Sequence, residues 1–201
     1  MNTRIEALLG EIRNLESQLL EESKRKQHEF CYRMHDRKVH FSEEARGRHQ
    51  LLRQSVHSYL LKSRFLVILT GPIIWMGLVP ILLVDVVGTI YQTICFPIYG
   101  IPKVRRADYI AFDRHRLSYL NPIEKLNCEY CAYANGIPVY FTGVAARTEQ
   151  HWCPIKHAGC LKCAHSRYRH FTEFGDGEGY RSRLEEIRRE FDDLETPEDP
   201  A

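Results

Sequence analysis

One long apolar stretch constrains this chain more than any other feature. Between Arg64 and Lys103, the sequence FLVILTGPIIWMGLVPILLVDVVGTIYQTICFPIYGIP contains a single charged residue, Asp85. One membrane span needs about 20 apolar residues, and two spans joined by a turn need more than about 40. The length falls between these values. We therefore expect residues 65–104 to be embedded in a membrane, with Trp75 and Asp85 as its candidate site residues.

The ends of this stretch bear on its topology. Basic residues flank it on both sides (Lys62, Arg64, Lys103, Arg105 and Arg106). Positive residues beside a membrane segment tend to stay in the cytoplasm. A re-entrant helical hairpin keeps both flanks there, whereas a single span keeps only one. We favour the hairpin, with Asp85 at its tip or at the interface, because a carboxylate inside hydrocarbon is costly.

The segments before the apolar stretch are expected to be helical. Apolar residues recur at spacings of three and four from Thr3 onward (Ile5, Leu8, Ile12, Leu15 and Leu19). This seam fits either self-association or packing within the same chain. Residues 1–50 are interpreted as a charged amphipathic or short coiled-coil arm. Residues 51–64, apolar on one face, are interpreted as an interfacial helix.

Residues 105–175 are interpreted as a small cytosolic helical domain rich in cysteine. Asn121-Pro122-Ile123-Glu124 predicts a helix start, with Asn as the cap and Glu at the third helical position. Asn135-Gly136 predicts its end. A second helix is expected from Pro138 and a third after Pro154. The predicted fold class is thus mainly α, with a membrane-embedded hairpin or single span.

Cysteine spacing points to a metal site in this domain. Cys128 and Cys131, like Cys160 and Cys163, have the pair spacing of zinc ribbons. Two additional candidate ligands, Cys153 and His157, lie between these pairs. We expect a zinc ion, with an iron–sulfur cluster or mononuclear iron as alternatives. Buried cysteines that only pack are the competing interpretation.

Four strings also resemble a known family. FPIYGIPKVRRADYI, DRHRLSYLNPIEKLNCEYCAYANG, AARTEQHWCPIKHA and SRYRHF are similar to an uncharacterised family of bacterial inner-membrane proteins. The resemblance covers roughly residues 30–180. It implies a bacterial inner-membrane location and carries no activity. The Cys-rich domain is expected on the cytoplasmic side.

The last segment, residues 176–201, is interpreted as an amphipathic helix and a disordered tail. Before it, Arg167, Tyr168, Arg169 and His170 form a basic-aromatic run that fits a solvated helix face better than a headgroup contact.

No Walker loop, nucleophile elbow or zincin motif occurs, and no block of like charge indicates nucleic-acid binding. The expected function is a membrane-bound accessory or scaffold protein with structural zinc, its partners being the bilayer and a copy of itself or a membrane complex. The alternative is a membrane-anchored redox or metal-handling protein. An enzyme is the least favoured class.

Overall fold

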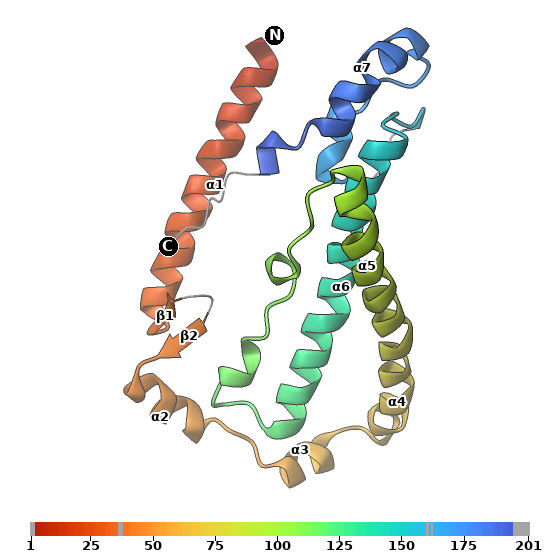
Figure 1. Ribbon diagram of the computed structural model, residues 1–201. Coiled ribbons are helices and arrows are strands. Elements are labelled where there is room, and N and C mark those ends of the chain that lie inside the picture. Colours follow the sequence, from red (N-terminus) through yellow and green to blue (C-terminus); the bar gives the residue numbers. More distant parts are fainter. Residues whose placement is uncertain (1–2, 36–37, 160, 162, 195–201) are drawn as a thin grey trace. The chain divides into compact units, whose positions relative to one another are not determined.

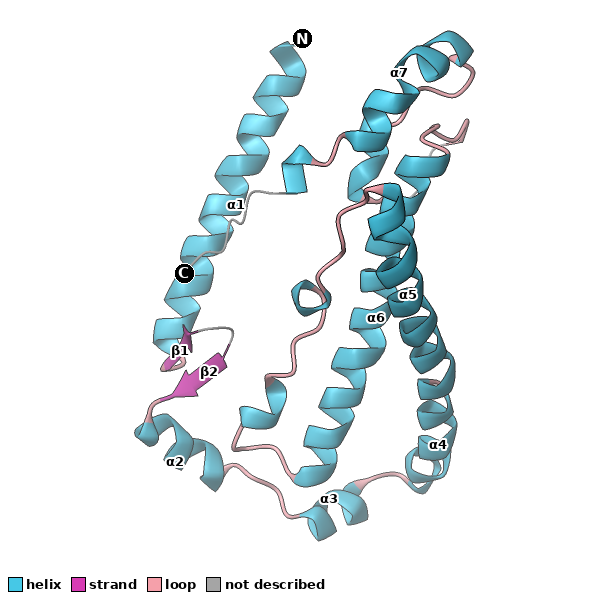
Figure 2. Ribbon diagram, in the orientation of Figure 1, coloured by secondary structure: helices cyan, strands magenta, loops and turns pink. Residues whose placement is uncertain are grey.

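The computed structural model describes residues 3–35, 38–159, 161 and 163–194, and it is mainly helical, as expected (Figures 1 and 2). The chain divides into two compact units. The first, here the N-terminal unit, comprises Met1–Tyr59 with Asp113–Lys125, and the second, the apolar unit, comprises Leu60–Phe112 with Leu126–Ala201. The apolar stretch therefore interrupts the N-terminal unit.

The N-terminal unit contains helix α1 (Thr3–Glu29). An antiparallel hairpin follows, formed by β1 (Tyr32–His35) and β2 (Lys38–Phe41) in the register Tyr32↔Phe41. This hairpin was not predicted from the sequence. Leu15 and Leu19 are 57% and 70% exposed on α1. The other seam side chains lie outside the described part, so the pairing of the seam stays a prediction.

Two short helices lead toward the apolar stretch. Helix α2 (Glu43–Leu51) is capped by the Ser42 hydroxyl, which accepts a hydrogen bond from the backbone of Ala45. Helix α3 (Val56–Lys62) follows after a break. The predicted interfacial helix over residues 51–64 is therefore shorter than expected.

Residues 113–121 pack on this hairpin and on α2. Within them, η2 (Arg114–Arg116) is a single 3-10 turn. Arg116 donates a hydrogen bond to the Val39 carbonyl at 3.2 Å. The Tyr119 ring meets the edge of His49 at 5.1 Å between centroids. Residues that precede the apolar stretch are thus held to residues that follow it.

The apolar unit begins with α4 (Phe65–Met76) and α5 (Leu78–Tyr99). Gly77 between them keeps a right-handed helical backbone (φ −60°, ψ −18°). The ring of Pro80 conflicts with the Met76 carbonyl one turn earlier, which explains a break at this point. Phe65–Tyr99 form one interrupted helical run that is long and apolar enough to cross a membrane. A pair of antiparallel helices within residues 65–104 was the favoured prediction, and it is wrong.

Helix α5 ends at a glycine cap. Gly100 has φ +67°, and the amide of Ile101 donates to the Phe96 carbonyl at 2.9 Å. Residues 101–112, here called the return segment, then run back along α5 and contain the 3-10 turn η1 (Arg106–Asp108) (Figure 1). Val104 bonds to Gln92, and Arg106 reaches Asp85. The chain therefore does reverse, but as a helix followed by an irregular segment.

Helix α6 (Pro122–Trp152) starts as predicted and ends far later than predicted. The amide of Glu124 bonds to the Asn121 side chain at 3.0 Å, and the amide of Asn121 bonds to the Glu124 carboxylate at 2.8 Å. The predicted stop at Asn135-Gly136 is wrong, because the helix continues through it and through Pro138. No separate second helix exists in this range.

The remaining elements pack on α6. The predicted third helix after Pro154 is replaced by irregular chain and the 3-10 helix η3 (Ser166–His170) in the described residues. The predicted C-terminal helix is present as α7 (Gly177–Arg189), capped by Asp176, and η4 (Asp192–Leu194) follows. Residues 177–194, with α7 and η4, are here called the C-terminal segment. The core unites α5, the return segment, α6 and this segment (Phe96, Ile101, Val104, Ile137, Tyr140, Val144 and Phe191).

Candidate functional site

A polar cluster, formed by Asp85, Arg106 and Tyr133, lies where the return segment meets α5 and α6. Asp85 is only 6% exposed. It pairs with the Arg106 guanidinium and accepts a hydrogen bond from the Tyr133 hydroxyl at 2.6 Å. Burial raises the pKa of the Tyr133 phenol to about 12, and the bond to Asp85 acts in the same direction, so the phenol stays a donor.

A second set of polar contacts lies two turns further along α5. The Gln92 amide donates to the Tyr140 hydroxyl at 2.6 Å and accepts from the backbone of Val104 at 3.0 Å. Gln92 is 7% exposed and Tyr140 is 1% exposed. A buried amide must find such partners, because an unpaired polar group costs about 1–3 kcal/mol. These bonds fix the return segment against both helices.

Trp75, the other predicted membrane residue, lies close to the break between α4 and α5. Its ring packs on Tyr130 of α6 at 4.8 Å between centroids. The Tyr130 hydroxyl donates a hydrogen bond at 2.7 Å to the Ile74 carbonyl, which is one of the carbonyl groups in the last turn of α4. Trp75 therefore helps to join α4 to α6. Asp85 is not at a hairpin tip, since it lies within α5 and is paired.

The surface of α4 and α5 is unusual for a water-soluble protein. No residue of α4 is buried, and apolar side chains cover it all round. On α5, most of the large exposed apolar side chains recur at helical spacing and form one uncharged stripe (Val79, Leu82, Leu83, Val86, Val87, Ile90, Ile94 and Ile98). Exposed apolar surfaces of this extent mark contact with a membrane or another protein.

The predicted metal ligands are spread along the apolar unit. Cys128 and Cys131 lie near the start of α6, whereas Cys153 follows its end. Cys128 and Cys153 are 25 positions apart, which is about 37 Å along a helix. His157 stacks on Tyr168. Cys163 is exposed, and Cys160 lies outside the described residues.

The structure therefore does not bring the two cysteine groups together. In the described part of the chain, no three His, Cys, Asp or Glu side chains come close enough to hold a metal ion. Cys128 and Cys131 do share one side of α6, as the sequence analysis expected of a spacing of three. A complete site at this pair needs ligands from elsewhere.

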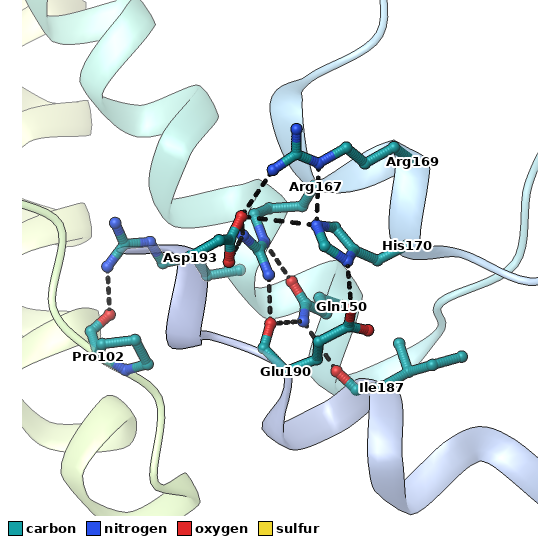
Figure 3. Close-up of polar contacts among 9 residues, drawn as sticks. Pro102, Gln150, Arg167, Arg169, His170, Ile187, Glu190 and Asp193 are labelled. Carbon is teal, nitrogen blue, oxygen red and sulfur yellow. Dashed lines mark hydrogen bonds and ion pairs between the residues drawn. The ribbon is translucent and has the colours of Figure 1, made fainter. Parts of the chain in front are cut away.

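A second polar site, absent from the sequence predictions, attaches the C-terminal segment to α6 (Figure 3). Arg167 is 2% exposed and bonds to both carboxylate oxygens of Asp193 at 2.7 Å. Its guanidinium also donates to the Gln150 side chain and to the Glu190 carbonyl. The basic-aromatic run is therefore not a solvated helix face, because its first arginine is a buried structural residue.

Neighbouring groups add charge to this site. His170 contacts the Glu190 carboxylate at 2.9 Å, and Arg169 bonds to Asp193 at 2.8 Å (Figure 3). Burial by itself raises the pKa of Asp193, but hydrogen bonds from Arg167 and Arg169 outweigh it and hold that pKa below its usual value. Asp193 is therefore ionised at neutral pH and holds the C-terminal segment in place.

One signal for the missed polar residues was present in the sequence. Gln92 is a large polar residue inside the apolar stretch, and such a residue needs a buried partner. Its partners Tyr140 and Val104 cannot be read from the sequence, because both depend on the turn at Gly100.

Comparisons with protein-family models, with curated proteins and with solved structures found no match for this chain.

Proposed function

We propose that this chain is a membrane-bound accessory or scaffold protein that enters the bilayer from one face and leaves it on the same face. The observation that carries the proposal is that the N-terminal unit is formed by two separate stretches of the chain. The chain leaves this unit after Tyr59 and re-enters it at Asp113. The contacts of Arg116 with Val39 and of Tyr119 with His49 hold the two parts together.

This arrangement limits the number of membrane crossings. A compact unit lies on one side of a bilayer, so residues 60–112 must cross either twice or not at all. The helical run Phe65–Tyr99 offers one crossing. The way back is the return segment, which is irregular and carries exposed charges at Lys103 and Arg105. Irregular, charged chain does not traverse hydrocarbon, because its backbone groups lack partners there.

Insertion without crossing agrees with the length of α4. Helix α4, on which no residue is buried, is 12 residues long, or about 18 Å, and is shorter than a hydrocarbon core of about 30 Å. The bend at Gly77 then lets the uncharged stripe of α5 lie against lipid while its other face packs on α6. The pairing of the buried Asp85 with Arg106 avoids the cost of an isolated charge near hydrocarbon.

The basic flanks favour the cytoplasmic face of a bacterial inner membrane. A protein of this kind can present its N-terminal unit and its C-terminal segment to partners at the membrane surface. Zinc enters the proposal only with ligands from a second molecule, because Cys128 and Cys131 are far from Cys153 along α6. This architecture supports the accessory function. So does the lack of a Walker loop, a nucleophile elbow and a zincin motif in the sequence.

Membrane attachment through α4 can be tested with matched variants. Leu69→Glu with Ile73→Glu places two charges one turn apart on α4, where both residues are exposed. This variant should leave the membrane fraction after an alkaline wash, whereas wild type should need detergent. The control Leu15→Glu with Leu19→Glu has the same spacing on α1 and should stay attached. Wild-type protein in a detergent-free supernatant would contradict the proposal.

A further inference from the structure

A cavity of about 400 Å³ lies wholly within the N-terminal unit. Four segments that are distant in sequence form its walls: β2, the start of α2, the turn η2 with the residues after it, and the first turn of α6. Its lining is mostly polar and basic (Val39, His40, Phe41, Glu43, Arg46, His115, Arg116, Ser118 and Lys125). The volume is within the range of small-molecule sites.

The charges around this cavity are unbalanced. Arg46, Arg116 and Lys125 are cationic at neutral pH, and His40 and His115 lie beside them. Glu43 is the one carboxylate in the lining. Like charges gathered at close range repel and oppose folding. Cations brought together from separate segments are therefore more stable when an anion lies between them.

The contacts of the two arginines are consistent with an anion between them. Arg116 is held in position by its hydrogen bond to the Val39 carbonyl. Arg46 pairs with Glu43 at 3.2 Å, but the two side chains are 53% and 89% exposed. An exposed pair of this kind is weak because water screens it, so an incoming anion can compete for Arg46.

We propose that this cavity binds a phosphate-bearing anion, either a free phosphate group or the phosphate headgroup of a lipid. Guanidinium groups match phosphate oxygens in paired hydrogen bonds. The Lys125 ammonium supplies a further positive charge, and the Ser118 hydroxyl a neutral donor. The proposal rests on the N-terminal unit alone. The anion site can therefore be absent while the membrane proposal holds, and the membrane proposal can fail while the anion site is present.

The test uses the full chain in lipid nanodiscs and inorganic phosphate as the probe, titrated calorimetrically at constant ionic strength. The variant is Arg46→Gln with Lys125→Gln, which leaves the Arg116 bond intact. Arg25→Gln is the matched control, because Arg25 also pairs with a glutamate three residues earlier on an exposed helix face. Thermal unfolding of each variant checks that it is folded.

In phosphatidylcholine discs, wild type and Arg25→Gln should bind phosphate saturably, and the double variant should bind about tenfold more weakly. If discs that also contain phosphatidic acid suppress the binding of phosphate to wild type, the lipid headgroup is the ligand. If they do not, a free phosphate group is. The proposal is overturned if wild type binds no phosphate saturably in phosphatidylcholine discs, or if the double variant binds phosphate there as tightly as wild type.

Discussion

Among single residues, Asp85 connects three segments of the apolar unit. Its carboxylate joins α5 to the return segment through Arg106 and to α6 through Tyr133. Removing one partner from a buried ion pair leaves the other unsatisfied, which is costly. The side chain of Arg106 is 46% exposed and can turn toward water, so the loss falls mainly on Asp85.

We expect Arg106→Gln to lower the free energy of unfolding by about 1–3 kcal/mol because Asp85 then loses its charged partner. The measurement is thermal or denaturant unfolding in detergent, completed as a double-mutant cycle with Asp85→Asn. The two changes should be strongly non-additive, with a coupling of about 0.5–3 kcal/mol. Strict additivity would mean that the two side chains do not interact.

Gly136 permits a close approach between α6 and the return segment. A Cβ atom there would lie 2.7 Å from the Tyr109 carbonyl oxygen and 2.7 Å from the Ile110 side chain. Gly136→Ala should therefore destabilise the protein by about 1–3 kcal/mol through overpacking. Gly47→Ala on α2 is the control, since nothing lies within 4 Å of its added carbon. That change should be neutral or stabilising by up to about 1 kcal/mol. Equal effects in urea unfolding would contradict the account.

The cap at the start of α6 and the glycine in its middle show which features could be predicted from the sequence and which could not. The cap formed by Asn121 and Glu124 depends on residues three positions apart, so the motif alone was sufficient. The role of Gly136 depends on Tyr109, which is brought beside it by the turn at Gly100. By itself, the pair Asn135-Gly136 indicates a helix end. In the folded chain, Gly136 instead leaves space for the return segment to pack closely against α6.

At the scale of elements, the continuity of α6 decides whether the cysteines can act together. Cys131 and Cys153 are 22 positions apart, which is about 33 Å along the helix axis. Spin labels at these two positions, with the other cysteines replaced by Ser, should give a long distance of this order by pulsed electron paramagnetic resonance. A distance near 10 Å would restore the helical hairpin and the shared metal site that the sequence suggested.

The attachment of α7 should depend on pH through Asp193. Its pKa is lowered in the folded protein, so its ionised form stabilises the fold above the unfolded-state pKa, and this contribution is lost as pH falls through the folded pKa. The melting temperature should therefore drop below about pH 4 by more in wild type than in Asp193→Asn. Asp192→Asn, a neighbouring change at an exposed residue, should behave like wild type. Identical pH profiles for all three proteins would contradict this assignment.

Pairings between elements were the least predictable part of the site. The amphipathic pattern of the C-terminal segment predicted a helix, and Ile187 is indeed fully buried. The salt bridge of Arg167 with Asp193 could not be predicted, because it joins residues 26 positions apart that are separated by α7 and by irregular chain on either side of it. For the same reason, a basic run that looked like a surface feature proved to contain a buried residue.

For the whole molecule, the central feature is that the chain begins and resumes one compact unit on either side of its apolar stretch. The basic flanks had favoured the same topology, although by a helical hairpin that α4 and α5 do not form. The charge of the flanks and contacts such as that of Arg116 with Val39 are independent properties of the chain, and both favour this topology.

The most direct test of this topology fuses a reporter to each end of the chain in turn. One reporter is an enzyme active only outside the cytoplasm, and the other is a fluorescent protein that matures only inside. We predict fluorescence and no external enzyme activity for both ends, because the N-terminal unit and the C-terminal segment then share the cytoplasmic face. External activity at one end with fluorescence at the other would show a single crossing and contradict the account.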